Sequence, residues 1–435
     1  MVPQEVKIYA GRNVPRLNYT AGLIIGDILG LSWEIVTDKR KLGKFPVINY
    51  SNEVIAGSFT LTPDSLLFES GISKKEINVT IWNELPVFFQ SGTGSDFPFD
   101  IFAASFYLVT RYEEYLDFMP DEHGRFCASS SLAWKHGFLD KPVVDLWARE
   151  FAKSLLSRIP TLAFKRSEFS AILTIDTDQP FAFKGKNLLR NVGGLIRDLS
   201  LKSGRATERY KVMAHDMKDP YEVFDYMIRM AEINGTETKF FFPTGSRSEY
   251  DHNPSWKNDI YRDLIRRITT SYEGCLHPSF QAAKNHKLIK EEHRRLEVIT
   301  GRKITSGRFH YIRLFTPESY RNLSRTGIKT DYSMGFHDEP GFRAGIARPY
   351  HFYDVVSDEP ADLYIVPFQV MDVTLYQYKK LDAARSEKII FKLIDITKKA
   401  GGLFVSLWHN TSLLETTEWQ EWRSLFEKML QYQRP

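Results

Sequence analysis

The sequence predicts an α/β protein, and three observations support this fold class. From residue 169 onward, short β-branched and apolar segments alternate with amphipathic helical segments, a pattern typical of parallel sheets. The pattern of apolar and polar residues changes across residues 157–170, where a proline and a short basic run occur. The chain has 435 residues, and domains average roughly 150. We therefore expect two domains, residues 1–165 and 166–435.

Residues 1–165 are expected to form a mixed α/β domain whose role the sequence does not indicate. Short strand-like segments precede one long apolar helix at residues 100–118. Five positions of this helix share one face at helical spacing: Ile101, Ser105, Leu108, Tyr112 and Tyr115. The strand-like segments are SWEIVTD (32–38), PVINYS (46–51), SFTLT (58–62) and LPVFF (85–89).

Residues 166–435 contain strand-like segments that alternate with helices. The segments are SAILTID (170–176), TKFFFPTG (238–245), EGCLHPS (273–279), SGRFHYIRL (306–314), DLYIVPFQV (362–370) and GLFVSLWHN (402–410). A short helix is expected to start at Thr316 and Pro317 and to close at Gly327. Apolar residues at helical spacing predict two more helices, with Val223, Tyr226, Met227, Met230 and Ala231 in one and Trp422, Leu425, Phe426, Met429 and Leu430 in the other.

Polar side chains follow the C-terminal ends of many of these strands. An open sheet gathers its site at a switch point between few strands, whereas a barrel brings every strand end to one face. The distribution therefore favours a (β/α) barrel with eight strands or fewer. The polar residues are Asp176, Asp178, Thr244, His277, Arg308, His310 and His409.

Composition narrows the classes of function. A hydrophobic fraction of 43% and a charged fraction of 26% are those of a soluble globular protein. The formal net charge of +4 is small for this length and does not indicate nucleic-acid binding. No segment approaches the ~18 apolar residues of a membrane span, and the N-terminus has no apolar signal segment, so we expect a cytoplasmic protein. The two cysteines stand far apart, so a metal site would be built from His, Asp and Glu.

Three histidines stand out because each follows or interrupts an apolar strand segment: His277, His310 and His409. A single histidine at such a position is most often a hydrogen-bonded core residue. Three of them, together with the acid pair Asp176 and Asp178 at another strand end, indicate a site. The alternative is an acid pair that only forms a salt bridge with Arg308 in a rigid barrel mouth.

The order of the motifs LTIDTD, TKFFFPTG, EGCLHPS, GRFHY, DYSMGF and VSLWHN resembles that of NodB-type polysaccharide deacetylases. The resemblance covers roughly residues 169–411. It implies a distorted (β/α) barrel that removes N- or O-acetyl groups from sugars with a divalent metal held by an Asp and two His. It also implies roles for single residues, with Asp176 as catalytic base, Arg308 orienting it, His277 as a metal ligand, Tyr311 donating its backbone N–H to the oxyanion and His409 as general acid.

The sequence departs from the family pattern in two motifs. Thr177 stands where the family has its metal-binding aspartate, and the second acid follows as Asp178. Alternate residues of a strand share a face, so this acid can still reach the site. Gln281 occupies the position of the second metal histidine, and His310 stands where the family usually has proline. We therefore expect Asp178, His277 and His310 to bind one divalent ion, with zinc the expected metal, and Gln281 to contact substrate.

Two further segments are candidates for binding a substrate or an acidic surface. The loop at residues 341–354 combines glycines, aromatic residues and arginines, which suits a sugar-binding rim, so Arg343 and Arg348 are candidate substrate ligands. The basic segment at residues 184–211 has two interpretations. It contacts an anionic glycan or an acidic membrane surface, or it is a solvated helix and loop at the edge of the barrel, which we favour.

These observations predict a metal-dependent hydrolase that removes an acetyl group from an amino sugar or a glycan biosynthetic intermediate. One alternative is a catalytically degenerate barrel that binds carbohydrate without cleaving it, which Thr177 and Gln281 favour. The other is hydrolysis of a different non-peptide C–N bond. The sequence does not indicate the oligomeric state.

Overall fold

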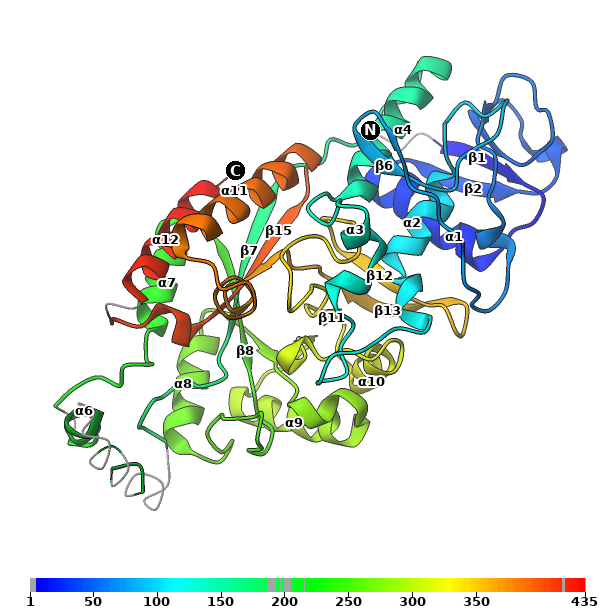
Figure 1. The fold of residues 1–435 in the computed structure, drawn as a ribbon. Coiled ribbons are helices and arrows are strands. Elements are labelled where there is room, and N and C mark those ends of the chain that lie inside the picture. The colour runs from blue at the N-terminus through cyan, green and yellow to red at the C-terminus, as the bar shows by residue number, and fades with distance from the viewer. Residues whose placement is uncertain are drawn as a thin grey trace.

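The N-terminal part of the chain forms a small parallel sheet flanked by helices. The computed structural model describes residues 5–185, 193–195, 198, 205–214, 216–416 and 419–434. The sheet has the order β2-β1-β3-β4, and every pairing in it is parallel; it lies at the upper right of Figure 1. Its strands are β1 (Glu5–Ala10), β2 (Ser32–Val36), β3 (Val47–Tyr50) and β4 (Phe59–Thr60). The other elements of this part are α1 (Pro15–Ala21), β5 (Thr80–Trp82), β6 (Leu85–Val87), α2 (Ile101–Val109), α3 (Leu132–Lys135) and α4 (Val143–Arg158).

The long helix predicted at residues 100–118 is shorter in the structure. Helix α2 ends at Val109, and a 3₁₀ turn follows from Tyr112 to Tyr115. Arg111 separates them because it takes a left-handed conformation with φ 54°. Its buried guanidinium donates to Glu113 and Glu114. These ion pairs bury three charged side chains together, which apolar periodicity alone does not anticipate.

The C-terminal part is built on a nine-stranded sheet of order β12-β13-β11-β10-β9-β8-β7-β15-β14. All of its pairings are parallel except that of β12 with β13. The strands are β7 (Ser170–Asp176), β8 (Glu237–Phe242), β9 (Glu273–Leu276), β10 (Ser306–Gly307), β11 (Thr330–Asp331), β12 (Tyr350–Asp354), β13 (Glu359–Ile365), β14 (Val370–Met371) and β15 (Leu403–His409).

The predicted closed barrel is not confirmed, because the sheet ladders form an open order that ends at β12 and β14. The chain between β13 and β14 nevertheless contacts both sides of this order. The backbone N–H of Phe368 donates to Met334 after β11 (3.0 Å), and that of Gln369 donates to Val405 in β15 (3.0 Å). Gly335 permits this approach, since a Cβ there would overlap the ring of Phe368. The C-terminal ends of strands distant in the order are thereby brought to one space.

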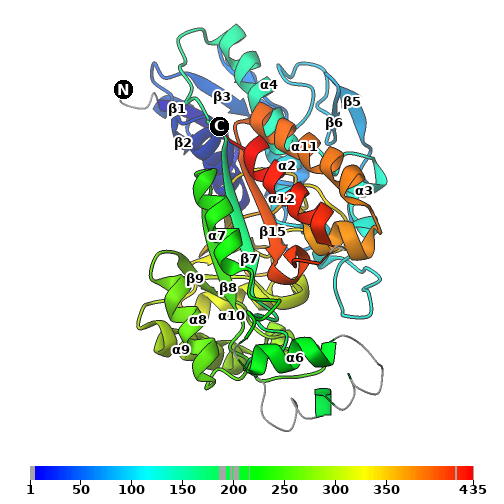
Figure 2. The same cartoon turned by 90° about the vertical axis from the view of Figure 1, so that its left-hand side faces the viewer.

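Helices surround the outside of this sheet, as Figures 1 and 2 show. They are α7 (Phe224–Ile233), α8 (Asp259–Thr269), α9 (His286–Thr300), α10 (Glu318–Thr326), α11 (Ala383–Ala400) and α12 (Gln420–Tyr432), with α6 (Arg205–Met213) at the periphery. The apolar positions predicted for the C-terminal helix are all buried in α12. Helix α10 is closed by Gly327 as its C-cap, as predicted, with φ 94°, and it begins at Glu318, one residue later than predicted. Within the described ranges, none of the helices is long and apolar enough to span a lipid bilayer.

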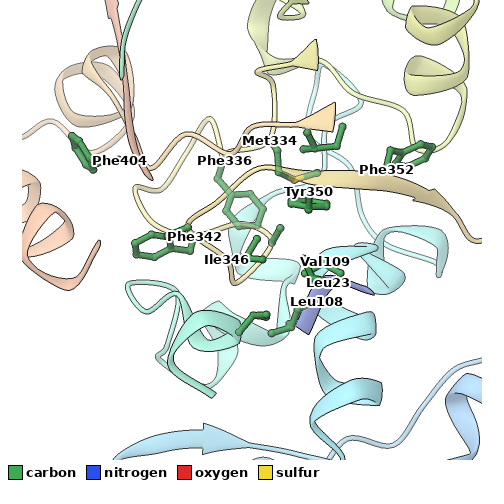
Figure 3. Packing of buried hydrophobic residues seen from close by; sticks show 14 of the residues in the cluster. Leu23, Leu108, Val109, Met334, Phe336, Phe342, Ile346, Tyr350, Phe352 and Phe404 are labelled. Carbon is green, nitrogen blue, oxygen red and sulfur yellow. The ribbon is translucent and has the colours of Figure 1, made fainter. Parts of the chain in front are cut away.

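The two parts of the chain share one hydrophobic core. Figure 3 shows Leu23, Leu108 and Val109 near side chains of the C-terminal part such as Phe336 and Ile346. Polar contacts join the parts as well, since the buried Arg16 pairs with Asp358 (2.7 Å). The boundary predicted at residue 165 falls between α4 and β7, and it stays a prediction.

Candidate functional site

A cavity of about 220 Å³ lies at the C-terminal ends of the strands of the large sheet. Residues that follow β7, β8, β10, β14 and β15 line it, and the N-terminal part of the chain adds Arg125. Of the side chains predicted for the site, Asp176, Asp178, His310 and His409 line this cavity. His277 is not part of this lining, and its side chain is almost fully buried.

Asp178, His277 and His310 form the centre of the site. Asp178 Oδ1 lies 3.1 Å from His277 Nε2, and Asp178 Oδ2 lies 3.2 Å from His310 Nε2. One potential ligand atom from each residue lies within 4.8 Å of the others. The side chains come from the ends of β7, β9 and β10, which are joined through β8 by parallel ladders. Backbone pairing therefore holds the three groups together before any ion binds.

The hydrogen bonding of His277 determines which of its nitrogens faces the carboxylates. Its Nδ1 lies 2.6 Å from the backbone carbonyl of Arg308, which can only accept, so Nδ1 carries the proton. In the neutral ring Nε2 then presents a lone pair to Asp178 Oδ1. Among the described residues neither of these buried atoms has a hydrogen-bond partner. Two facing acceptors at this distance call for a cation or a proton between them, and an imidazole with its other nitrogen fixed is typical of a metal ligand.

His310 is oriented by a carboxylate that the sequence analysis missed. Asp251, in the loop after β8, accepts from His310 Nδ1 at 2.9 Å and from the backbone N–H of Phe280 at 3.0 Å. Burial lowers the pKa of His310, but the charges of Asp178 and Asp251 outweigh it and raise the pKa to about 10. Burial likewise raises the pKa of Asp178, yet the charge of the protonated His310 holds it well below its ordinary value. Asp251 carried no signal in the sequence, because it stands in a polar loop several residues after its strand.

Asp176 lies beside this cluster and is held by Arg308. Its Oδ1 accepts from Arg308 Nη1 at 2.8 Å, and its Oδ2 lies 3.7 Å from His277 Nε2. The guanidinium is completely buried and also donates to the Tyr332 carbonyl (2.9 Å) and to Thr174 Oγ1 (2.8 Å). The planar guanidinium is thus fixed at three points, which fixes the orientation of the Asp176 carboxylate.

His409 is paired with a second carboxylate that the sequence analysis missed. Its Nδ1 lies 2.8 Å from Asp372 Oδ1, and its Nε2 lies 3.6 Å from Asp178 Oδ2. Burial lowers the pKa of His409, but the charge of Asp372 outweighs it and raises the pKa to about 9. Asp372 directly follows β14. The predicted strand at 362–370 stopped short of it, so the same strand-end criterion would have found Asp372 with a better boundary.

Tyr311 forms part of the cavity wall in a strained conformation. Tyr311 and Ile312 both have positive φ values, 60° and 53°, which side chains with a Cβ rarely adopt and which cluster at functional sites. Arg125 donates to the Tyr311 carbonyl at 2.9 Å. Contacts from a distant part of the chain therefore stabilise this turn.

Thr177 does not face the cavity. Its Oγ1 and its backbone N–H both donate to the Phe241 carbonyl in β8, at 2.8 and 3.0 Å. The flanking residues Asp176 and Asp178 both line the cavity, as the alternation of side chains along a strand predicts. The position that departs from the family motif therefore serves the contact between β7 and β8.

Three predicted substrate ligands lie outside the cavity lining. Gln281 is exposed on the 3₁₀ turn Phe280–Lys284. Arg343 is buried in an ion pair with Glu114, and Arg348 is paired with Asp145, so both arginines join the two parts of the chain. Most of the basic segment at 184–211 lies outside the described residues.

A second group of potential ligands does not suit a metal ion. Asp121, Cys127 and His337 lie close together. However, the Asp121 carboxylate already accepts from the guanidinium and the backbone N–H of Arg125. A guanidinium bound to the same carboxylate opposes a second cation there.

Comparisons with known proteins leave the function open. Residues 6–160 match the model of a family of unknown function, DUF7033, and no curated protein matches the chain. Among solved structures, a putative polysaccharide deacetylase from Mycobacterium smegmatis is 13% identical, with 62% of this chain and 86% of that chain covered and a TM-score of 0.40. A polysaccharide deacetylase from Bacillus cereus is 11% identical, with coverages of 62% and 87% and a TM-score of 0.31. A CE4 family pseudoenzyme from Bacillus anthracis is 11% identical, with coverages of 60% and 60% and a TM-score of 0.30. These similarities are too low to carry an argument about activity, which has to come from the site itself.

Proposed function

We propose that the protein is a metal-dependent hydrolase that removes an acetyl group from an amino sugar or a glycan biosynthetic intermediate. The observation that carries the proposal is the pair of buried acceptor atoms, Asp178 Oδ1 and His277 Nε2, that face each other at 3.1 Å beside His310. One carboxylate and two imidazoles are a donor set that zinc binds. A divalent ion bound there would polarise an acyl carbonyl and lower the pKa of a water molecule.

The side chains around this centre provide the proton transfers that acetyl hydrolysis needs. Asp176, oriented by Arg308, acts as the base that accepts a proton from the attacking water. His409, whose pKa is raised to about 9, holds a proton at neutral pH and donates it to the leaving amine or hydroxyl. The two residues are register partners on the adjacent strands β7 and β15, so one rigid ladder sets their separation. The backbone N–H of Tyr311 donates to the oxyanion.

The lining of the cavity supports a carbohydrate substrate. Aromatic side chains from three different loops, Tyr250, Tyr311 and Tyr378, border it together with the amides of Gln179 and Gln377. Aromatic faces with a few polar groups that fix orientation are typical of small-molecule sites. Sugars present both apolar CH faces and hydroxyl groups to such a lining. We also propose that the protein is located in the cytoplasm.

The proposal is tested first by metal content. Full-length protein is loaded with zinc, desalted and analysed by mass spectrometry. His277→Ala is compared with a matched control, His136→Ala, which changes an exposed histidine distant in sequence from His277. Wild type and His136→Ala should retain about one equivalent of zinc, because one cluster of three ligands is expected to bind it. His277→Ala should retain much less. Equal zinc content in wild type and His277→Ala contradicts a metal site at this centre.

Activity is tested by acetate release from a panel of N- and O-acetylated sugars. Asp176→Asn should keep its zinc and lose activity, since Asp176 lies beside the three expected ligands and is not one of them. Sugar binding without acetate release from any member of the panel would instead favour a non-catalytic carbohydrate-binding protein. Acetate release from non-sugar amides alone would favour a hydrolase that acts on a different non-peptide C–N bond.

A further inference from the structure

The N-terminal part of the chain contributes a wall to the candidate site. We propose that residues 117–130, named the capping loop here, close one side of the cavity and restrict the substrate to a single acetylated unit, either a monomer or the end of a chain. This inference rests on the function proposed above and deepens it by naming the form of the substrate. It also assigns a role to the N-terminal domain, for which the sequence offered none.

The capping loop binds three separate strand-end loops of the large sheet. Arg125 Nη1 donates to the Tyr311 carbonyl after β10 at 2.9 Å, and Arg125 Nη2 lies 3.1 Å from the Tyr378 hydroxyl, which follows β14. Asp121 Oδ2 lies 3.3 Å from His337 Nε2, after β11. The loop therefore covers the mouth on the side of β10, β11 and β14.

A cluster of rings extends this wall. The ring of His123 packs edge-on against Tyr250, Phe280 and Tyr311, with centroids 5.4, 5.5 and 5.2 Å apart. The carbonyl of His123 accepts from Arg313 Nε at 2.8 Å. Two of the contacted rings, Tyr250 and Tyr311, line the cavity directly. The capping loop thus sets the position of aromatic side chains that a sugar ring would contact.

Arg125 acts through its neighbours and is a positioning residue. It is only 4% exposed, and its Nε donates to Asp121 at 2.8 Å while its other nitrogens hold Tyr311 and Tyr378. Because its charge is paired with Asp121, it does not offer a strong site for an anionic substrate. Its effect is to hold the strained turn at Tyr311 and the hydroxyl of Tyr378 at fixed places on the rim.

The size of the cavity agrees with a short substrate. Its volume of about 220 Å³ is below the roughly 300–1,000 Å³ of sites that enclose drug-sized ligands. An enzyme that acts inside a linear polymer needs a groove through which the chain runs in both directions from the reacting unit. A wall fixed to three strand-end loops blocks one of these directions. The acetylated unit that reacts must then be the terminal unit of the chain.

The experiment compares N-acetylglucosamine with its β-1,4-linked dimer, tetramer and hexamer on zinc-loaded, full-length protein. Calorimetry on Asp176→Asn measures binding, and mass spectrometry of wild-type products locates the units that have lost acetyl. We expect dissociation constants for dimer, tetramer and hexamer within about threefold of one another, and acetyl loss at a terminal unit alone. Affinity that rises about tenfold or more from dimer to hexamer, which is roughly 1.4 kcal/mol, or acetyl loss at interior units, overturns the inference.

Two variants test the role of Arg125. Arg125→Met should raise the KM of the monomer about tenfold with a smaller change in kcat, and should permit acetyl loss at interior units of the hexamer, while Arg125→Lys recovers part of the wild-type KM. Hydrogen exchange should accelerate at residues 309–313 in Arg125→Met and stay unchanged in the matched control Arg40→Met, which lies on the exposed surface. Unchanged exchange and unchanged chain-length dependence in Arg125→Met exclude the positioning role.

The outcomes separate this inference from the proposed function. Binding of dimer and hexamer with equal affinity but without acetate release supports the end-unit site and contradicts the hydrolase. Acetate release from interior units supports the hydrolase and contradicts the end-unit site. Absence of binding for every member of this series and for every sugar of the acetylated panel overturns both.

Discussion

Replacement of Thr177 by aspartate tests whether this side chain serves the contact between β7 and β8 and not the cavity. Thr177→Asp restores the adjacent aspartate pair of the deacetylase motif, so the sequence alone suggests a gain of metal affinity. The structure predicts a loss of stability instead, because the side chain is completely buried and points to the Phe241 carbonyl. Burial without a cationic partner raises a carboxyl pKa by roughly 3–5 units, and ionisation at pH 7 then costs about 4 kcal/mol. The lost hydroxyl hydrogen bond adds about 1 kcal/mol.

The assay is denaturant unfolding at pH 7 and pH 5, with Thr177→Val as the matched control. The control removes the same hydrogen bond but leaves the Phe241 carbonyl paired with the backbone N–H of residue 177, so we expect it to lose about 1 kcal/mol. For an acid with a raised folded pKa, the deficit grows as pH rises above the unfolded pKa of about 3.9. The deficit of Thr177→Asp relative to Thr177→Val should therefore be about 4 kcal/mol at pH 7 and about 1.5 kcal/mol at pH 5. Equal stability of the two variants at pH 7, or tighter zinc binding by Thr177→Asp, would refute a structural role of Thr177 between β7 and β8.

Three other substitutions probe the carboxylates that orient or pair with charged side chains. Asp251→Ala removes the acceptor that orients His310, so zinc affinity should fall about 10–100-fold in a competition with a chelator; unchanged affinity would argue against His310 as a ligand. Asp372→Asn removes the charge that raises the pKa of His409, so NMR titration should find this pKa below about 9, and no downward shift would contradict the pairing. Glu114→Gln leaves two buried arginine side chains without their shared carboxylate and should cost about 3–5 kcal/mol at pH 7. Burial raises the pKa of Glu114 but the arginine charges lower it to about 2, so the stabilisation is complete above the unfolded pKa of about 4.3 and is lost as pH falls through 2. The deficit of Glu114→Gln, measured by unfolding, should shrink over that interval.

Local patterns in the sequence predicted those features that depend on neighbouring residues. The alternation along residues 170–178 indicated that Asp176 and Asp178 share a face, and both line the cavity. The apolar spacing of the last helix predicted the buried face of α12. Such features follow from the geometry of one strand or one helix, so a single sequence is enough to infer them.

Features that depend on distant partners escaped the sequence analysis. Arg343 and Arg348 stand in a loop whose composition suits sugar binding, yet acidic residues from the N-terminal part of the chain bury or pair both of them. The helix expected at 100–118 ends early because Arg111 forms ion pairs that hydrophobic periodicity does not register. Asp251 reaches His310 only through the tertiary fold. In each case the decisive contact joins residues whose proximity no local pattern encodes.

Arg308 contacts both the proposed catalytic base and one of the proposed metal ligands. Its side chain holds the Asp176 carboxylate, and its backbone carbonyl fixes the tautomer and the ring orientation of His277. Its backbone N–H donates to the carbonyl of Leu276 at 2.9 Å, so β9 and β10 set the position of the residue itself. The proposed base and the proposed metal ligand therefore cannot shift independently of each other. Because a catalytic base must lie within reach of a water that the metal site also contacts, this single buried arginine fixes the separation on which the proposed reaction depends.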